Sequence, residues 1–440
     1  MTIRLICYIA CELDLELLQC DVRAAYLLGK IEDGVELYIQ TPDGYALSED
    51  ITAILRSGLY GCKQGGNRWA VKRTNTLRDL GAYPSPADPS LYIKTNGKGS
   101  IIFTCTVVDD FLITGTPASY VTQFKNTLFS RFEMTGGKAA DWFINLNITR
   151  NRKRGMLKLD QSRYTEQVLH AFGMSNCKRV RTPAPQGQVL TKAMCPVTTI
   201  EKAAAAAVPY QSILGKLLYF RITRPDILQI VSKLASFSSC WGIPHWKAAK
   251  YVLRYLAGTI NHGLVFKSSG KTLSDKWKLQ MYVDSDYATD PDTRKSRAGY
   301  LIYLNGNLIS YRSCLQPGNP DVATGTCEAE YKALSLALKE LTWIRMLLNT
   351  MHIDIDKPMM IWEDNQATIK LAKDASASKR TKHIDVRHHF IRQFYDEGLI
   401  DIKYIATRSQ TADILTKSLG PELFKPFRDK IVSDIDLHLI

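Results

Sequence analysis

The chain has 440 residues, of which 45% are hydrophobic and 23% are charged, and its formal net charge is +14. This length allows two or three domains with substantial cores, and the composition is that of an ordinary globular protein. The excess of Lys and Arg favours a polyanionic partner, with nucleic acid ahead of an anionic membrane surface. No segment has the apolar length of a membrane span, and the first residues carry no cleavage signal. The ten cysteines include no C-x-x-C pair, which predicts reduced thiols in an intracellular protein and disfavours a structural zinc site.

Residues 1 to about 135 alternate helical and extended patterns. The stretch TIRLICYIACELDLE has helical periodicity, and LLQCDV after it predicts a strand that ends at Asp21. GNRWAVKRTNTLRDLG predicts a helix closed by Gly81. Strands are predicted in SLYIKTNGKGSIIFTCTVVDDFLITG, joined by the strong turn signal Asn96-Gly97. This mixture indicates an α+β unit with an antiparallel sheet.

The stretch Arg181–Pro209 breaks this pattern, because it has four prolines, an alanine run and little periodic hydrophobicity. We expect a surface loop or linker here, followed by helices over residues 210 to about 262 and a second linker-like patch, SSGKTLSDKW. Strands are then predicted in LQMYVDSD, AGYLIYLN and NLISYR, and a long amphipathic helix in CEAEYKALSLALKELTWIRMLLN. A strand (MMIWED), helices, a strand (DIKYIA) and a final helix complete the chain.

Two adjacent acids, Asp109 and Asp110, lie at the tip of the hairpin predicted in TVVDDFLITG. Turn chemistry is the ordinary explanation for such a pair, since Asp favours turns. The alternative is a metal site completed by Asp21, whose strand belongs to the same unit. Three converging carboxylates repel one another unless cations neutralise them, and Mg²⁺ prefers such oxygen ligands. Two Mg²⁺ ions held in this way can activate a 3′-hydroxyl and stabilise a leaving pyrophosphate.

Several stretches carry a resemblance to a known family: QCDVRAAYLLGKIEDGVELYIQTPDGY, LYGCKQGGNRW, VVDDFLITG, YQSILGKLLYFRITRPDI and AAKYVLRYLAGT. In this order they resemble reverse transcriptases of copia-type LTR retrotransposons. The resemblance implies a right-hand polymerase fold whose palm binds metal through Asp21, Asp109 and Asp110. It also implies that Tyr26 is the steric gate against a ribose 2′-hydroxyl and that Gln64 contacts the incoming nucleotide or the template. From the residues alone, the favoured interpretation of Tyr26 is a core aromatic and that of Gln64 a solvated loop side chain.

Four more acids come from a predicted strand, a helix, a strand end and the start of the final helix: Asp284, Glu330, Asp364 and Asp413. In a small α/β domain they can meet over one sheet and hold two Mg²⁺ ions for in-line hydrolysis of a phosphodiester. Glu328 competes with Glu330 for the helix position, and the helical phase does not decide between them. We expect Asp286 to be a supporting acid rather than a ligand.

These acids lie in YVDSDYATD, KSRAGYLIYLNG, TCEAEYKALSLALKE, WEDNQATIKLA, RTKHIDVRHHF and QTADILTKSL. The stretches resemble the ribonuclease H domain that follows the polymerase in copia-type elements, and its Asp-Glu-Asp-Asp set falls on Asp284, Glu330, Asp364 and Asp413. A zinc site at His383, His388 and His389 is the weaker interpretation, because no Cys or further His lies at ligand spacing. The basic run KRTKH fits phosphate contact or a solvated charged face.

The resemblance implies an α+β and α/β multidomain chain, in which a polymerase palm and thumb or connection-like region precede a ribonuclease H-like domain. The expected boundaries are 1–187 for the reverse transcriptase, 188–271 for the linker and helical connection, 272–425 for the ribonuclease H-like domain and 426–440 for a tail.

The implied cofactor is Mg²⁺, two ions per active site, with Mn²⁺ as a substitute. The implied partners are an RNA template, a DNA primer, an RNA–DNA hybrid, deoxynucleoside triphosphates and other parts of the Pol polyprotein, with no membrane. The implied location is intracellular, in a cytoplasmic virus-like particle or the nucleus.

The alternative function is that of a truncated, decayed or repurposed element copy that binds nucleic acid and retains only ribonuclease H activity. A fingers segment precedes Asp21 in the family, so we expect weak primer extension from a chain that begins twenty residues earlier. Other departures from the family pattern are Val107 before the aspartates, Ile144-Asn145 in place of Leu-Gly, and KQGGN in place of K-Q-x-P-R. A structural protein at a membrane surface is a third hypothesis, which only the net charge supports.

Overall fold

The computed structural model describes residues 1–40, 44, 52–97, 99–318, 322–374 and 385–439. The chain divides into two compact units. The N-terminal unit comprises Thr2–Ala10 and Asp14–Ile144, and the C-terminal unit comprises Met1, Cys11–Leu13 and Asn145–Ile440. Helices and strands alternate in both units, so the expected α+β and α/β multidomain class is confirmed. In the part of the chain that is described, no helix has the length and apolarity needed to cross a bilayer.

The N-terminal unit is built on a six-stranded antiparallel sheet with the order β4-β5-β6-β7-β1-β8. Its elements are α1 (Thr2–Glu12), β1 (Leu17–Val22), η1 (Ala25–Leu28), β2 (Tyr38–Gln40), β3 (Thr52–Ile54), α2 (Gly65–Asp79), β4 (Tyr83–Pro84), β5 (Leu91–Thr95), β6 (Ile101–Val107), β7 (Asp110–Thr116), α3 (Ala118–Arg131), β8 (Met134–Ala139) and β9 (Trp142–Phe143). The predicted helix ending before Gly81 and the predicted strands are present. Gly81 and Gly97 both have positive φ, as the predicted helix end and turn require.

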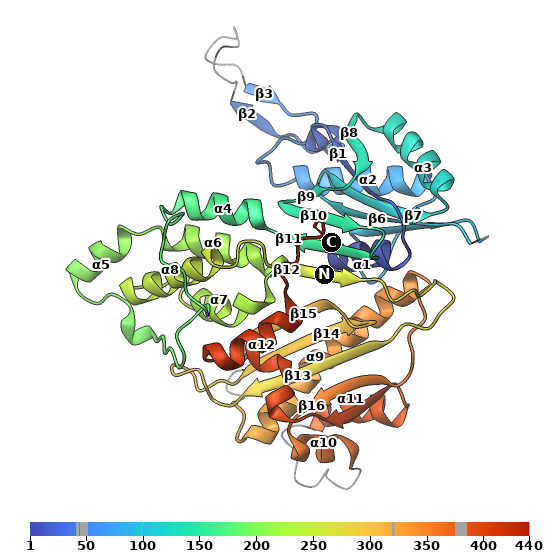
Figure 1. Ribbon diagram of the computed structural model, residues 1–440. Helices are drawn as coiled ribbons and strands as arrows, with labels where there is room; N and C mark the ends of the chain where they lie inside the picture. The colour runs from blue at the N-terminus through green and yellow to red at the C-terminus, as the bar shows by residue number, and fades with distance from the viewer. Residues whose placement is uncertain (41–43, 45–51, 98, 319–321, 375–384, 440) are drawn as a thin grey trace. The chain divides into compact units, whose positions relative to one another are not determined.

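The core of this unit lies between the sheet and the helices α2 and α3. Trp69 and Leu77 of α2 and Phe124 of α3 are buried in one apolar cluster with Phe111 and Ile113 of β7. The alternation of apolar and polar residues along β1 places one set of side chains in this core. Figure 1 shows α2 and α3 beside the strands of this sheet.

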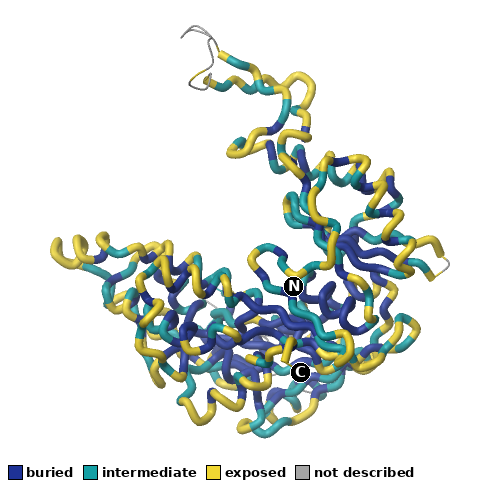
Figure 2. The backbone as a smooth tube through the Cα atoms, turned by 45° about the horizontal axis from the view of Figure 1, so that its top comes forward, coloured by how far each residue is buried: buried dark blue, intermediate teal, exposed yellow. Residues whose placement is uncertain are grey.

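The C-terminal unit contains a second sheet of five strands with the order β15-β14-β13-β16-β17. Strands β13 (Leu279–Asp286), β14 (Arg297–Leu304) and β15 (Asn307–Leu315) are antiparallel, whereas β16 (Met359–Glu363) and β17 (Ile400–Tyr404) run parallel to β13. The long helix α9 (Thr326–Thr350) packs against β13 and β14. The remaining C-terminal elements are α10 (Gln366–Lys373), α11 (Asp385–Asp396), η6 (Thr407–Ser409), η7 (Thr411–Leu415) and α12 (Pro421–Ile431). All residues of β14 and many of α9 are buried. Buried residues are drawn in dark blue in Figure 2.

The N-terminal part of this unit is mainly helical. Its elements are β10 (Leu146–Asn151), β11 (Met156–Asp160), α4 (Ser162–Ala171), η2 (Lys192–Met194), α5 (Thr199–Ala206), α6 (Tyr210–Tyr219), η3 (Phe220–Ile222), η4 (Pro225–Ile227), α7 (Leu228–Ala235), α8 (Ile243–Ala257) and β12 (Gly263–Lys267). The helix α5 lies in the stretch expected to be a loop or linker. Its capping box explains the difference, because the side chain of Thr198 accepts from the Glu201 amide while Glu201 accepts from the Thr198 amide.

A fully buried ion pair joins two of these helical elements. Arg224 donates to both carboxylate oxygens of Asp226, at 3.0 and 2.8 Å, and Tyr255 of α8 donates to the same carboxylate at 2.6 Å. Arg224 also donates to the carbonyl and hydroxyl of Thr259, just beyond α8. Burial alone would raise the pKa of Asp226, but Arg224 outweighs burial and lowers it. The stretches FRITRPDI and RYLAGT therefore form one internal network.

Candidate metal centres

The first acidic cluster consists of Asp21, Asp109 and Asp110, each half-buried. Asp21 of β1 lies opposite Asp110 of β7 in the antiparallel register, and Asp109 belongs to the two-residue turn between β6 and β7. Each residue offers a carboxylate oxygen such that the three oxygens lie within 4.8 Å of one another. The fold therefore brings together the three acids that the sequence predicted would converge.

The turn that carries Asp109 has an unusual backbone and is held by α2. Val108 has φ of 55°, in the left-handed region that β-branched residues avoid. Its carbonyl accepts the indole N–H of Trp69 at 2.7 Å and a guanidinium N–H of Arg73 at 3.2 Å. The Asp109 carbonyl accepts the Val22 amide at 3.0 Å, which ties the turn to β1. These contacts fix the backbone at the point where the acids meet.

The electrostatics of the first cluster show uncompensated like charge. Burial, followed by Asp21 and Asp109, raises the pKa of Asp110 to about 6. Burial and the charge of Asp109 also raise the pKa of Asp21. Within the described ranges, none of the three acids forms an ion pair with Lys or Arg. A divalent cation would relieve this repulsion, and the donor set consists entirely of the oxygen ligands that Mg²⁺ prefers.

The second acidic cluster consists of Asp284 at the end of β13, Glu330 in α9 and Asp364 directly after β16. Their carboxylate oxygens also lie within 4.8 Å of one another, although the residues span 80 positions of the chain (284 to 364). Asp284 and Glu330 are buried and Asp364 is half-buried. One oxygen of Glu330, Oε2, is buried and has no hydrogen-bond partner among the described residues. Such an orphaned oxygen is available to a metal ion.

A lysine links the fourth predicted acid, Asp413, to this cluster. Lys417 lies 2.8 Å from Asp413 Oδ1 and 3.4 Å from Asp284 Oδ1. Burial and then the charge of Asp284 raise the pKa of Asp413 to about 7, although Lys417 opposes both. The sequence predicted that Asp413 starts the final helix, but the residue lies in the separate short helix η7. Gln410 explains this, because it accepts from the Ala412 amide and so begins a separate short helix.

Comparison with known proteins supplies the family. Residues 1–186 match the model of the family described as reverse transcriptase (RNA-dependent DNA polymerase). The retrovirus-related Pol polyprotein from transposon TNT 1-94 of Nicotiana tabacum is 36% identical over 427 residues, which cover 96% of this chain and 31% of that protein. The corresponding polyprotein from transposon RE2 of Arabidopsis thaliana is 34% identical over 434 residues, 98% of this chain and 28% of that protein. The chain belongs to the copia-type family of retrotransposon Pol polyproteins. It spans less than a third of the length of these relatives.

The chain also aligns with solved structures of reverse transcriptases and ribonucleases H. An N-terminal ribonuclease H domain from Mycobacterium tuberculosis, solved as a fusion with maltose-binding protein, aligns at 14% identity over 34% of this chain and 96% of that chain, with a TM-score of 0.22. A foamy viral protease-reverse transcriptase in complex with double-stranded DNA aligns at 9% identity over 92% of this chain and 61% of that chain, with a TM-score of 0.20.

The two nucleotide-contacting residues expected from the copia-type resemblance lie at one end of α2. Tyr26 in η1 is half-buried and stacks on Tyr60, with ring centroids 4.5 Å apart. Gln64 is exposed and lies directly before α2. In KQGGN, a Cβ on Gly65 or Gly66 would lie 3.6 Å from the Tyr26 ring or hydroxyl, so the two glycines leave Tyr26 close to the helix. The roles of Tyr26 and Gln64 remain predictions.

The structure distinguishes Glu328 from Glu330 as the member of the second cluster, which the helical phase could not do. Glu328 accepts from the amide and the hydroxyl of Thr324 and pairs with Lys332 at 2.8 Å. Its carboxylate is therefore used in the first turn of α9, whereas Glu330 joins the second cluster. Asp286 lies two residues beyond Asp284, and burial, followed by the charge of Asp284 among others, raises its pKa to about 6.

The histidine hypothesis falls largely outside the described part of the chain. His383 and the side chain of His388 lie outside the described part of the chain. His389 of α11 is exposed. The zinc site remains an untested alternative.

Three positioning residues were missed from the sequence. Trp69 is read from the sequence as an apolar helix residue, but its N–H anchors the turn of the first cluster. Gln410 is fully buried and donates to the Val283 carbonyl at 2.8 Å, which fixes η7 beside β13. Glu363, directly before Asp364, is also fully buried. An acid in an otherwise apolar strand is the sequence signal that could have identified it. Burial, followed by the charge of Glu363, raises the pKa of Glu330.

Proposed function

We propose that this chain carries two activities, RNA-directed DNA polymerase at the first cluster and ribonuclease H at the second. The observation that supports both is the pair of three-carboxylate clusters, each with oxygens within 4.8 Å. The family match covers the first cluster, and the similarity to copia-type polyproteins covers both. The proposed domain boundaries remain 1–187, 188–271, 272–425 and 426–440.

The residues of each cluster would hold Mg²⁺, with Mn²⁺ as a substitute. In the polymerase these are Asp21, Asp109 and Asp110, and in the ribonuclease H they are Asp284, Glu330, Asp364 and Asp413. Bound Mg²⁺ would polarise the reacting phosphate and activate the attacking hydroxyl or water. The proposed substrates are primer–template and deoxynucleoside triphosphates at the first cluster and the RNA strand of an RNA–DNA hybrid at the second.

The protein's own part in the polymerase is to hold the acids and place the nucleotide. Trp69 and Arg73 hold the turn, so that Asp109 and Asp110 keep their positions when substrate binds. Tyr26 would exclude the ribose 2′-hydroxyl, and Gln64 would contact the incoming nucleotide or the template. In the ribonuclease H, Lys417 neutralises part of the charge of Asp284 and Asp413 before any metal binds.

The test runs primer-extension and hybrid-cleavage assays on one preparation with Mg²⁺. Asp110→Asn should abolish extension and leave cleavage, whereas Glu330→Gln should abolish cleavage and leave extension. Glu328→Gln is the matched control for the second change, because an amide oxygen can still accept the Thr324 bonds. A parent chain that cleaves hybrid but extends no primer would favour the alternative of a repurposed copy. A parent chain with neither activity would overturn the proposal.

A further inference from the structure

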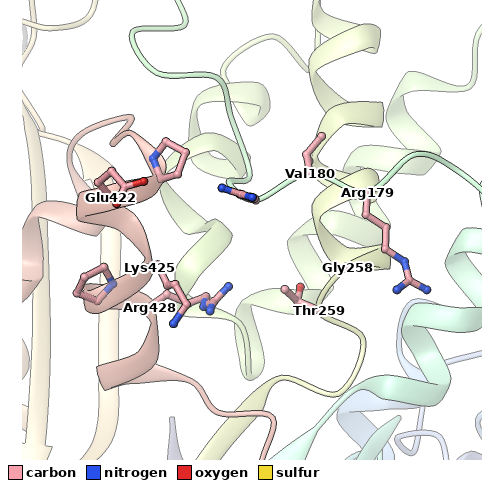
Figure 3. Close-up of a pocket in the computed structure, with 10 residues that line it drawn as sticks. Arg179, Val180, Gly258, Thr259, Glu422, Lys425 and Arg428 are labelled. Carbon is pink, nitrogen blue, oxygen red and sulfur yellow. The ribbon is translucent and has the colours of Figure 1, made fainter.

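A basic pocket lies within the C-terminal unit, and none of its lining residues belongs to the second cluster (Figure 3). Its volume is about 590 Å³, within the usual range for ligand pockets. Four cationic residues line it: Arg179, Arg181, Lys425 and Arg428. Among its described lining residues, Glu422 is the one acid. In Figure 3, Lys425 and Arg428 of α12 lie across the pocket from Gly258 and Arg179.

The wall of the pocket is firmly held. Thr259 accepts two hydrogen bonds from Arg224 of the buried ion pair, at 2.9 and 2.7 Å. At Gly258, an added Cβ would lie 3.5 Å from the Cβ of Arg179, so the two chain segments pack closely. Arg254 of α8 donates to the Lys178 carbonyl at 2.7 Å, which ties the segment before Arg179 to the same helix. A preformed wall of this kind lowers the entropic cost of binding a ligand.

The four cations differ in whether they already have partners. Lys425 and Arg428 both bond to Asp429, at 2.7 Å for Lys425 and at 2.9 and 2.7 Å for Arg428. Arg179 and Arg181 are exposed and form no hydrogen bond or ion pair with any residue that the structure describes. A guanidinium group matches the geometry of a phosphate and can donate to it through two N–H groups. Two such groups at a pocket with a single acid therefore favour a phosphate ligand.

The pocket is close to the second cluster along the chain. Lys417, which contacts Asp284 and Asp413, lies four residues before Pro421, which lines the pocket. Four residues span at most about 14 Å. One nucleic-acid strand carries a phosphate about every 3.4 Å along the helix axis, so this reach corresponds to about four nucleotides. A strand at the second cluster can therefore place another of its phosphates at the pocket.

We infer that the pocket of Arg179, Arg181, Lys425 and Arg428 binds a backbone phosphate of the same nucleic-acid strand that occupies the second cluster. The nature of the strand rests on the proposed function. A free nucleotide would present the same phosphate chemistry, but the short link to Lys417 favours a strand. Val180 and two prolines of α12, Pro421 and Pro426, add apolar surface for a sugar or base.

The experiment measures binding of a short fluorescein-labelled RNA–DNA hybrid to the full chain by anisotropy, in EDTA so that no cleavage occurs. The test variant is the double substitution Arg179→Gln and Arg181→Gln. The matched control is Lys202→Gln with Lys276→Gln, which removes the same charge from exposed lysines outside the pocket. The test variant should bind about tenfold more weakly, and the slope of log affinity against log salt should fall by about 1 to 2. The control should change affinity by less than about twofold, with the same slope as the parent.

Each outcome has a defined meaning. Equal losses in the test and control variants would overturn the pocket, because net charge alone would explain them. If hybrid binding is unchanged and only the test variant loses AMP binding, the pocket takes a free nucleotide. That result would overturn the proposal that it binds a backbone phosphate of a strand. Failure of the parent chain to bind hybrid would overturn the proposed function, and AMP binding by the parent and the two variants would then show whether the pocket takes phosphate at all.

Discussion

The two acidic clusters face the same problem of like charge and meet it in different ways. The first cluster gathers three half-buried acids from two paired strands and the turn beside them, and no ion pair to these acids lies in the described ranges. The second gathers two buried acids and one half-buried acid from a strand, a helix and a strand end, and Lys417 lies 3.4 Å from Asp284. The first therefore depends on an added cation for neutralisation, whereas the second is partly neutralised by the protein itself.

The two clusters also differ in the elements that assemble them, because the first lies within one sheet whereas the second joins a sheet to a helix. Asp109 and Asp110 are adjacent, and Asp21 lies opposite Asp110 in the register of one sheet. The second cluster depends on Gln316 as well, which donates to the Ser285 hydroxyl at 3.0 Å and to the Ala329 carbonyl at 2.7 Å. That side chain joins β13 to α9 beside Asp284 and Glu330. Damage to packing should therefore affect the second cluster more, and loss of metal should affect the first more.

The largest expected effect separates the two clusters by activity. Asp364→Asn should lower Mg²⁺-dependent cleavage of a hybrid's RNA strand by at least about 10³-fold, because a lost metal ligand removes several kcal/mol of transition-state stabilisation. The thermal midpoint should stay near that of the parent, since the change removes a like charge. Primer extension on the same preparation is the internal control. Cleavage that survives in this variant would show that Asp364 is not a ligand.

The next prediction concerns the internal cation. Lys417→Met should lower the free energy of unfolding by about 2 kcal/mol, because Asp284 and Asp413 lose their partner in a partly exposed site. Added Mg²⁺ should restore most of this loss, measured by urea unfolding with and without the ion. Lys373→Met is the matched control, since Lys373 pairs with Asp401 at 2.8 Å with similar exposure. The control should cost at most about 1 kcal/mol and should not respond to Mg²⁺. Equal responses of the two variants would remove the distinction between the clusters.

Much of the fold was predictable because the local signals agree with the final structure. The predicted strands around Asp21 and Asp109, and the long helix that carries Glu330, appear at the expected residues. The helix α5 was missed because its composition resembles a linker, while the decisive contact is the capping box of Thr198 and Glu201. Asp413 was placed on the wrong element because the tertiary hydrogen bonds of Gln410 fix η7 there.

The acids of the two candidate sites were predictable from the sequence, whereas the residues that hold them in place were not. Family motifs and the chemistry of paired carboxylates pointed to residues that the structure brings together. The choice between Glu328 and Glu330 needed the contacts with Thr324, which helical phase cannot supply. Trp69 and Val108 are 39 positions apart, and Lys417 and Asp284 are 133 positions apart. A local sequence pattern therefore cannot predict either contact.

The third prediction uses pH to expose the uncompensated charge of the first cluster. Without metal, the pKa of Asp110 is raised to about 6 by burial and by Asp21 and Asp109. Folding therefore favours its protonated form, and this contribution to stability is present below about pH 4 and lost as the pH rises through about 6. In EDTA, the parent should lose about 1 to 2 kcal/mol more than Asp110→Asn between these limits, after allowance for the exposure of the group. Mg²⁺ should reduce that difference, and identical pH profiles for parent and variant would contradict the prediction.

The smallest expected effect tests whether the turn of the first cluster is strained. Val108 has φ of 55° and is 42% exposed, so its side chain contributes little burial to offset an unfavourable backbone conformation. Asn tolerates this conformation better, and the carbonyl that accepts from Trp69 is kept because it belongs to the backbone. Val108→Asn should therefore raise the free energy of unfolding by about 0.5 to 1 kcal/mol, measured by urea unfolding, without changing hybrid cleavage.

Val189→Asn supplies the control for this prediction. Val189 is 56% exposed and is not among the described residues with positive φ, so the same substitution relieves no strain there and should not stabilise the chain. A gain at both positions would indicate a general effect of replacing an exposed valine. A loss at Val108 would show that its side chain supports the turn, and the first cluster would then depend on packing as the second does. A gain at Val108 alone would mean that the backbone beside Asp109 and Asp110 is held in place by Trp69 and Arg73 against its own preference.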